Sequence, residues 1–349
     1  MGQSRKLRRT LRGIVIFLSL SLFGSGSYAA YLMIIKPITT TVDKIGATTT
    51  GKEIDEVTDV EVEAVKPISL LLLGIDNRPE SGSLNSDIIM VATLNPETKS
   101  ATIVSLPRDS HLSPGKGLPS RKANYYYPYF HNKEKLTAYK HTRDLFGNFF
   151  QIPIDAAVSV DFDGFRKMVD ELGGVDIDVP MNMRYVDNAD GTNINLKKGP
   201  QTLNGKQALD YVRYRKSNMG TAESSDTERN KRQHEVIDQM LGKVFSLGGV
   251  MKLNKLMEIA GDHVQTDIPA SKLLDFFQKY IGIDRSKIQY ISLEGEWISP
   301  FIELSQEEIE QARQALKDTL EGKTATPQTS EDGSNVSSAT TTPAPGTRP

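Results

Sequence analysis

Two carboxylates and two guanidiniums stand at the ends of three apolar runs early in the chain. The runs share the length of a strand and have turn residues at both ends. They cover residues 68–75, 88–94 and 101–106. In a meander, the first run ends, the second begins and the third ends along one edge of the sheet. That edge would carry Asp76, Asp87 and Arg108, with Arg78 close by, which predicts a site for a metal ion and an anion.

A second polar cluster lies at residues 210–233. Arg213 and Arg215 are two positions apart, so in an extended segment they point to the same side. Asp226 is placed to cap a helix from residue 227 onward, and Arg229 and Gln233 share one face of that helix. The N-terminus of a helix with an arginine in its first turn favours phosphate, because backbone N–H groups, the helix dipole and a bidentate guanidinium act together.

Solvated surface charge is the alternative for this cluster. It is the preferred interpretation for Lys231 and Arg232, whereas for the other three arginines a function and plain surface charge weigh equally. Other chemistries find less support. The chain has no cysteine, which excludes a thiolate zinc site and a cysteine nucleophile, and its five histidines lack metal-ligand spacing. Glycine-rich phosphate loops are absent, and Ser105 and Ser110 lack the setting of a nucleophile elbow.

The remaining pattern predicts a sheet with helices packed on it. Further strands are expected at 154–160, 175–179 and 288–293, and helices at 133–149, 162–172, 205–212, 227–247, 252–260, 270–280 and 305–320. The strand–helix–strand order across 154–179 predicts a crossover connection, hence an α/β fold. The aromatic run at 125–130 is expected to be a loop that packs on the core, with a lining for a lipid or sugar as the alternative.

The N-terminus predicts a membrane anchor. Five basic residues lie in the tail 1–12, and the uncharged run 13–35 would span roughly 34 Å as a helix, enough for a bilayer core. The basic flank predicts a cytoplasmic N-terminus and an extracellular remainder. Ser27-Tyr28-Ala29 leaves a cleaved signal peptide as the alternative, although the apolar run continues beyond it.

Composition separates the rest of the chain into three parts. Residues 36–66 are expected to be an extracellular stalk, 67–320 the folded domain, and 321–349 a disordered tail rich in Thr, Ser and Pro. The net charge of −2 argues against a nucleic-acid partner, because there is no basic excess to neutralise phosphates.

Taken together, several blocks resemble the LytR–CpsA–Psr family of Gram-positive cell envelopes. The blocks occur in order over about residues 67–245, which makes the resemblance specific. They are LLLGIDNR (71–78), SDIIMV (86–91), SLPRD (105–109), VDELGGVDIDVP (169–180), LKKGPQTLNGKQALDYVRYR (196–215) and Arg229…Arg232-Gln233. The resemblance implies an α/β/α domain, a central mixed sheet sandwiched by helices.

The resemblance also implies roles for the two clusters. Carboxylates matching Asp76 and Asp87 would hold Mg²⁺, with Mn²⁺ as an alternative. The pyrophosphate of the substrate would contact Arg108, Arg213, Arg215, Arg229 and Gln233. Of these, Arg108, Arg213 and Arg229 are the expected catalytic residues.

Two departures from the family pattern stand out. The family often has arginine directly before the Ser-Asp pair, where this chain has Asn85. Pyrophosphate binding would then be weaker, or its work would shift to Arg78. The segment 122–127 is also altered, which bears on the lipid pocket.

The implied activity is transfer of a glycopolymer, such as teichoic acid or capsule, from an undecaprenyl-pyrophosphate carrier to peptidoglycan. No general base is assigned, and Asp109 and Asp226 are merely candidates for that role. Two alternatives remain: a non-catalytic protein that captures lipid-linked or wall polymer, and a regulator. The expected partners are therefore the membrane, the lipid-linked polymer and peptidoglycan.

Overall fold

The computed structural model describes most of the chain between residues 66 and 323. The gaps are 79–82, 116, 189–190, 245, 247–251, 270–271, 273–275, 277–278 and 281. The predicted anchor at 13–35, nearly all of the stalk and the tail after 323 lie outside the described residues, as does most of the helix expected at 270–280. Among the helices that are described, none is long and apolar enough to cross a bilayer.

A six-stranded mixed sheet forms the centre of the fold, as predicted. Its order is β11 (Val264–Thr266), β6 (Ala156–Asp161), β1 (Ile68–Arg78), β2 (Ser83–Asn95), β3 (Ser100–Leu106) and β12 (Ile288–Ser292). The first three strands of the chain are the predicted antiparallel meander. Parallel pairs then add β6 beside β1 and β12 beside β3, while β11 runs antiparallel to β6.

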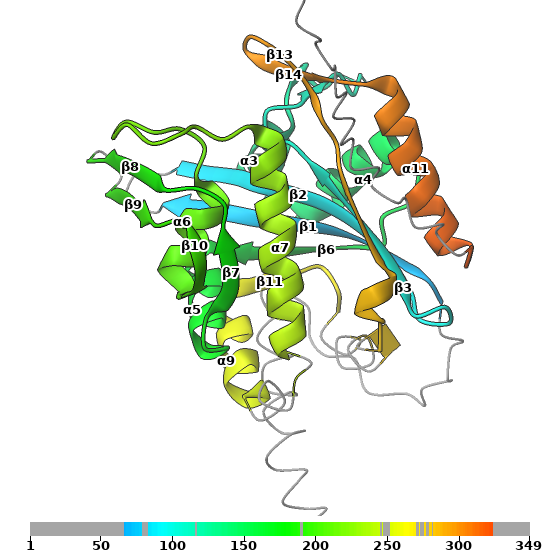
Figure 1. Ribbon diagram of the computed structural model, residues 1–349. Helices are drawn as coiled ribbons and strands as arrows, with labels where there is room; N and C mark the ends of the chain where they lie inside the picture. Colours follow the sequence, from blue (N-terminus) through cyan, green and yellow to red (C-terminus); the bar gives the residue numbers. More distant parts are fainter. Residues whose placement is uncertain are drawn as a thin grey trace, which may run out of the picture.

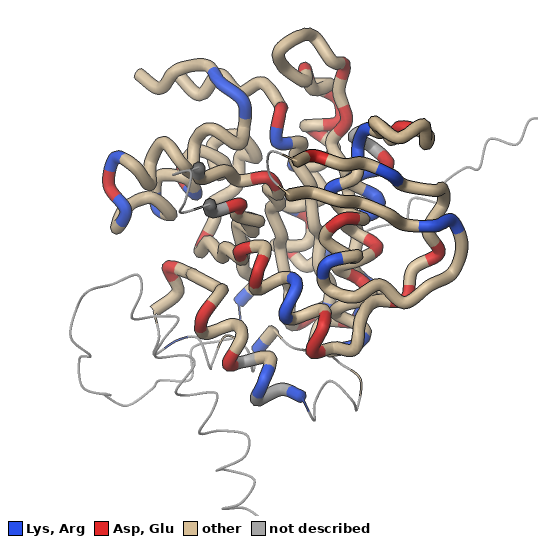
Figure 2. The backbone as a smooth tube through the Cα atoms, turned by 90° about the vertical axis from the view of Figure 1, so that its left-hand side faces the viewer, with Lys and Arg blue, Asp and Glu red and all other residues tan. Residues whose placement is uncertain are grey.

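Helices cover both faces of the sheet, which gives the expected α/β/α layers (Figure 1). One layer, here the aromatic layer, contains α3 (Tyr126–Lys133), α4 (Ala138–Phe150) and α11 (Gln306–Leu320). The other, here the cleft layer, contains α5 (Phe162–Glu171), α6 (Gly205–Arg213), α7 (Asp226–Val244) and α9 (Leu253–His263). Lys and Arg alternate with Asp and Glu on the side that carries much of the cleft layer (Figure 2).

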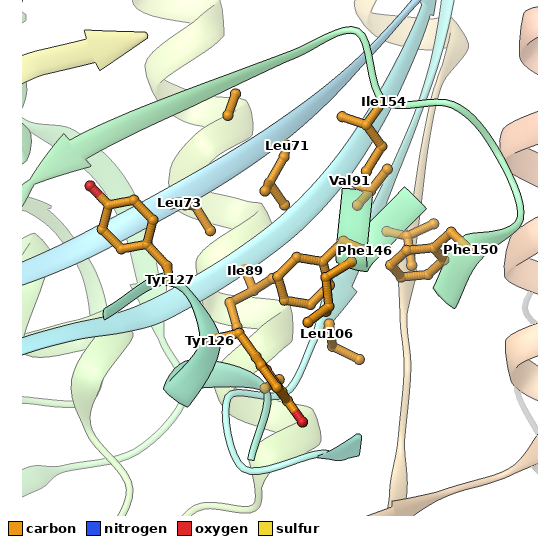
Figure 3. Packing of buried hydrophobic residues seen from close by; sticks show 14 of the residues in the cluster. Leu71, Leu73, Ile89, Val91, Leu106, Tyr126, Tyr127, Phe146, Phe150 and Ile154 are labelled. Atoms are coloured by element: carbon orange, nitrogen blue, oxygen red, sulfur yellow. The ribbon is translucent and has the colours of Figure 1, made fainter. Parts of the chain in front are cut away.

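The aromatic layer holds the largest buried cluster. Leu71, Leu73 and Val91 point from the sheet onto Phe146 and Phe150, which are 1% and 0% exposed (Figure 3). Strand alternation explains the division, because successive side chains point to opposite faces. The neighbouring strand residues therefore face the cleft layer, where Leu70, Met90 and Ala92 form a separate cluster.

Two predictions about the elements were wrong in detail. The aromatic run at 125–130 is helical, comprising the end of a 3₁₀ turn and α3, although its rings do pack on the core as expected. Pro128 is compatible with α3 because it lies in the first turn, where its missing N–H is not needed. The strand β7 (Val175–Val179) does form, but it pairs with β10 (Gly199–Leu203) and does not join the central sheet.

Three further small hairpins complete the described part of the fold. They are β4 (His111–Leu112) with β5 (Arg121–Lys122), β8 (Met183–Asp187) with β9 (Thr192–Leu196), and β13 (Gly295–Ile298) with β14 (Phe301–Leu304). None of the three was predicted. The last two lie near the edge of the sheet that carries the polar cluster.

Candidate active site

A β-bulge brings the two predicted metal carboxylates to one side of the sheet. Gly74 pairs with Ile88 and Ile75 pairs with Ser86, so Asp87 is an extra residue in β2. Asp87 and Ile88 consequently both line the cleft on the side of the cleft layer. Asp76 follows Gly74 by two positions and therefore faces the same side.

The bulge depends on the glycine opposite it. A Cβ atom at Gly74 would lie 2.8 Å from Cβ of Ile88, closer than two carbon atoms can approach. A larger residue at this position would push Ile88, and with it Asp87, out of place. Asp76 itself is 8% exposed and does not reach the lining of the cleft, whereas the side chain of Asp87 is 17% exposed and does.

Arg108 joins the carboxylates from the end of β3. Its Nη1 donates to Oδ1 of Asp87 at 2.8 Å, and its side chain remains 36% exposed at the cleft. Burial opposes the charge on Arg108, but Asp87 and Asp109 outweigh that effect and hold its pKa above the usual range. Arg108 is therefore a fixed cation with one side bound to a carboxylate and the other open to an anion.

Asp109 connects three cations behind the site. Lys122 Nζ donates to its Oδ1 at 2.9 Å, Arg108 Nε lies 3.5 Å from its Oδ2, and Arg215 Nη1 lies 4.0 Å from the same atom. Burial favours the protonated form of Asp109, but the hydrogen bond from Lys122 and the charges of Lys122, Arg108 and Arg215 lower its pKa below the usual range. Such a carboxylate is a poor general base and serves to position its partners.

The helix α6 delivers Arg213 and Arg215. It begins with a capping box in which the side chain of Asn204 accepts from Gln207 N, while Gln207 bonds back to Asn204 N. It ends at Arg213, so Arg215 lies just beyond the helix, and both arginines line the cleft as predicted. Arg213 lies over the ring of Phe162, at 5.4 Å from its centroid.

The helix α7 supplies Arg229 and Gln233. Both line the cleft and are 7% and 8% exposed, so the predicted shared helical face exists. Asp226 was expected as the cap, and that expectation was wrong: α7 begins at Asp226, and Ser225 Oγ accepts from Glu228 N at 3.1 Å, while Ser225 N donates to Glu228. The side chain of Arg78, expected to contact the pyrophosphate, lies outside the described residues.

Arg232 was expected at the surface, and that expectation was wrong. It is 3% exposed and donates through Nε to the carbonyl oxygen of Tyr211 at 2.9 Å, and through Nη1 to Ser224 Oγ at 2.8 Å. Its Nη2 donates to the carbonyl oxygen of Tyr214. Because Tyr211 and Tyr214 bracket the end of α6, Arg232 fixes the segment that presents Arg213 and Arg215.

These groups surround one cleft of about 390 Å³. Its cations are Arg108, Arg213, Arg215, Lys216 and Arg229, and its carboxylates are Asp87 and Asp187. Its apolar lining comes chiefly from α5, α6 and β9, as Phe162, Ile194, Leu209 and Val212. The excess of cations fits a multiply charged anion, and the apolar side fits a hydrocarbon group attached to it.

Several cleft residues were missed by sequence reasoning. Tyr185, Asp187 and Thr192 lie on the hairpin of β8 and β9, and Lys216 directly follows Arg215. The two strands are short and the first has no clear alternation of apolar residues, so nothing in the sequence placed this hairpin beside the arginines. Lys216 lay within the segment 210–233, which was already singled out.

The donor set is compatible with Mg²⁺ but does not enclose it. Within the described ranges, no group of three or more Asp, Glu, His or Cys residues is arranged to hold a metal ion. Mg²⁺ commonly keeps several waters and takes one or two carboxylates together with substrate phosphates. Asp76 and Asp87 on one side of the sheet fit that incomplete shell.

Comparison with known proteins decides the family. The model of the LytR_cpsA_psr family matches residues 31–318, most of the chain and more than the blocks singled out above. This chain belongs to the LytR–CpsA–Psr family. Among its curated relatives, the polyisoprenyl-teichoic acid–peptidoglycan teichoic acid transferase TagV of Bacillus subtilis is 31% identical over 325 residues, covering 90% of this chain and 80% of TagV.

Other LytR–CpsA–Psr proteins agree with this assignment. The transferase TagU of Enterococcus faecalis is 27% identical over 332 residues, covering 93% of this chain and all of TagU. The crystal structure of B. subtilis TagV superposes with a TM-score of 0.59 at 32% identity, covering 73% of this chain and 98% of that one. The fold described above is therefore the fold of the family.

The departure at Asn85 can now be placed. Asn85 pairs with Asp76 across β1 and β2, two residues before Asp87. An arginine there, as the family often has, would stand beside that carboxylate. In this chain a neutral amide occupies the position. Arg108 places a cation beside the carboxylates through its hydrogen bond to Asp87.

Proposed function

We propose that this protein is a membrane-anchored phosphotransferase that moves an anionic glycopolymer from undecaprenyl pyrophosphate to peptidoglycan. The polymer would be of the teichoic acid type, which the names of the relatives indicate, or of the capsule type. The observation that carries the proposal is the single cleft in which Asp87, Arg108, Arg213, Arg215, Arg229 and Gln233 meet. Six predicted residues from four separate elements converge there.

The reaction requires little covalent work from the protein. A hydroxyl oxygen of peptidoglycan forms a bond to the phosphorus that carries the glycopolymer, the bond from that phosphorus to undecaprenyl phosphate breaks, and the hydroxyl proton is released. Negative charge shifts to the leaving oxygens, where guanidiniums stabilise it. Arg213 and Arg229 can each contact two oxygens at once, because the guanidinium is planar and forked.

A bound Mg²⁺ would neutralise charge on the phosphate oxygens. Asp76 and Asp87 would hold it, and the bond from Arg108 to Asp87 keeps that carboxylate oriented. Asp109 is unsuited to accept the hydroxyl proton, because three cations depress its pKa. Proton loss to solvent late in the step is compatible with a loose transition state, in which the nucleophile gains little charge early.

The test is a transfer assay on the full chain in liposomes, with a lipid-pyrophosphate-linked polymer as donor and a peptidoglycan oligosaccharide as acceptor. We expect Asp76→Ala and Asp87→Ala to abolish product formation without lowering the melting temperature, and chelation of divalent metal to do the same. Asp144→Ala on α4, a largely exposed carboxylate of the aromatic layer, is the matched control. Donor binding without transfer, even by the unaltered chain and with several acceptors, would instead favour a capture protein.

The anchor at 13–35 is part of the same proposal. The basic tail before it and the long apolar run support an uncleaved segment with the N-terminus in the cytoplasm. A protease added to wall-stripped cells should remove the domain and leave a short fragment in the membrane. A soluble protein that starts at Ala30 would show cleavage of a signal peptide instead.

A further inference from the structure

The hairpin formed by β13 and β14 is bound to the residue that follows Arg108. Ile302 N donates to the carbonyl oxygen of Asp109 at 2.9 Å, and Ile302 forms a bridge with Ser110. The hairpin stands at the end of the sheet (Figure 1). A Cβ atom at Gly295 would lie 2.3 Å from the carbonyl oxygen of Glu303, so the two strands approach closely. The hairpin is therefore a fixed extension of the site.

Trp297 is the single tryptophan of the chain, and this hairpin exposes it. Its side chain is 49% exposed, and its neighbour Ile298 is 52% exposed. Among the described residues, the other large apolar side chains with comparable exposure, Leu136 and Met219, lie on different elements. Successive side chains of a strand point to opposite faces, so Trp297 and Ile298 expose apolar surface on both faces of the hairpin.

Two cations of the site fix the tryptophan ring. Lys122 Nζ lies 5.5 Å and Arg215 Cζ lies 5.8 Å from the centre of the ring. Both residues also bind Asp109, and Arg215 lines the cleft. Arg215 thus lies between the ring and the proposed pyrophosphate position, and about half of the surface of Trp297 is open to solvent.

We infer that Trp297 is a stacking platform for a sugar ring of the peptidoglycan acceptor. This inference rests on the proposed function. A pyranose has a flat face of C–H groups and a rim of hydroxyls. The flat face matches the indole, whose π surface is electron-rich, and the rim would meet the polar groups of Lys122 and Arg215. The acceptor hydroxyl must come within about 3–3.5 Å of phosphorus, so its sugar ring must lie close to the arginines of the cleft, of which Arg215 contacts the indole.

The geometry of the cleft favours the acceptor over the lipid carrier. The apolar lining comes from α5, α6 and β9, and Trp297 belongs to none of these elements. Attacking and leaving oxygens are roughly in line in phosphoryl transfer, so the acceptor enters opposite the departing lipid phosphate. A lipid that leaves along the apolar lining therefore leaves the hairpin, which contributes nothing to that lining, available to the acceptor.

The single tryptophan makes binding measurable apart from transfer. In the detergent-solubilised full chain, a peptidoglycan oligosaccharide should quench or blue-shift the intrinsic fluorescence in a saturable way. Liposomes with brominated acyl chains test the competing membrane contact, since bromine quenches a tryptophan that enters the bilayer interface. A change that requires the lipid-linked donor, or quenching by brominated lipid with no response to the saccharide, would overturn the inference.

The kinetic test uses Trp297→Ala and Trp297→Phe in the transfer assay. We expect Trp297→Ala to raise the KM for the acceptor roughly tenfold, with donor binding unchanged, and Trp297→Phe to recover most of the loss because it keeps a ring. Met219→Ala is the matched control for an exposed apolar side chain. An unchanged acceptor KM in Trp297→Ala, with transfer intact, would refute the platform alone. A saturable fluorescence response without any transfer would support the platform and place the failure in the proposed function.

Discussion

The two layers on the sheet differ in what they hold together. On the aromatic layer, Phe146 and Phe150 fill the space against the strands and are almost fully buried. On the cleft layer, five cationic side chains and two carboxylates surround a cleft that opens to solvent. Apolar contact stabilises the first layer whether or not a substrate is present. Like charges in the cleft layer repel one another until an anion binds. The aromatic layer therefore contributes mainly to stability and the cleft layer mainly to activity.

The largest effect is expected in the aromatic layer. Phe146→Ala should lower the free energy of unfolding by about 3–5 kcal/mol, because it removes buried area and leaves a cavity. Transfer per folded molecule should stay the same. Thermal unfolding and the transfer assay together check this, with Leu136→Ala in the same layer as a control that should change little. A large loss of specific activity in Phe146→Ala would break the proposed division between the layers.

Arg232 should contribute both to stability and to activity. Arg232→Lys keeps the charge but cannot make all three hydrogen bonds to Tyr211, Tyr214 and Ser224, each worth about 1.5–3 kcal/mol for a charged donor. We expect a loss of stability of about 3 kcal/mol together with reduced transfer, since Arg213 and Arg215 lose their fixed position. Lys231→Ala, exposed on the same helix, is the control. Stability like that of the unaltered chain would show that the buried guanidinium is dispensable.

The arginines of the cleft should affect activity alone. Arg108→Lys, Arg213→Lys and Arg229→Lys keep the charge but lose the fork, so each should cost about 1.5–3 kcal/mol, or roughly ten- to a hundredfold. If they stabilise the transition state, turnover should fall more than donor affinity. Arg166→Lys on α5 is the control. Values like those of the unaltered chain for all three variants would remove the site assignment.

The last effect is a pH dependence in the cleft layer that appears only in acidic solution. His234 Nε2 lies 2.9 Å from Ser105 Oγ, and burial lowers the pKa of His234 to about 4. The unfolded chain takes up a proton near pH 6.5 while the folded chain resists it, so stability should fall as the pH drops from about 6.5 to about 4. His234→Gln should flatten that part of the curve, and His141→Gln should not. Identical pH profiles of the melting temperature would contradict this account.

The meander and its edge were predictable because the signal is local. The runs at 68–75, 88–94 and 101–106 are apolar enough to be strands in any context, and the polar residues beyond them must share an edge once the hairpin forms. The shared helical face of Arg229 and Gln233 follows in the same way from helical spacing. These local rules predicted each cluster separately, and the resemblance to the family implied that the two clusters share one site.

What failed depended on contacts between distant segments. The alternation of β7 shows a strand but not its partner, which is β10. Arg232 looks like any charged residue on a polar helix, because the carbonyl oxygens that it binds belong to a segment about twenty residues earlier. All residues of β13, the strand that carries Trp297, are exposed, so this strand shows no apolar period.

The pairing of β3 with β12 affects how the nascent chain behaves during synthesis. Ile103 pairs with Tyr290, so β3 cannot pair with β12 until the ribosome has made β12, late in synthesis. At 5–20 residues per second, that wait is on the order of ten seconds or more. During it the meander presents an unpaired edge, which is a template for strands of other chains. A nascent or truncated chain that stops before residue 288 should therefore self-associate through β3, which light scattering of such a truncation would register.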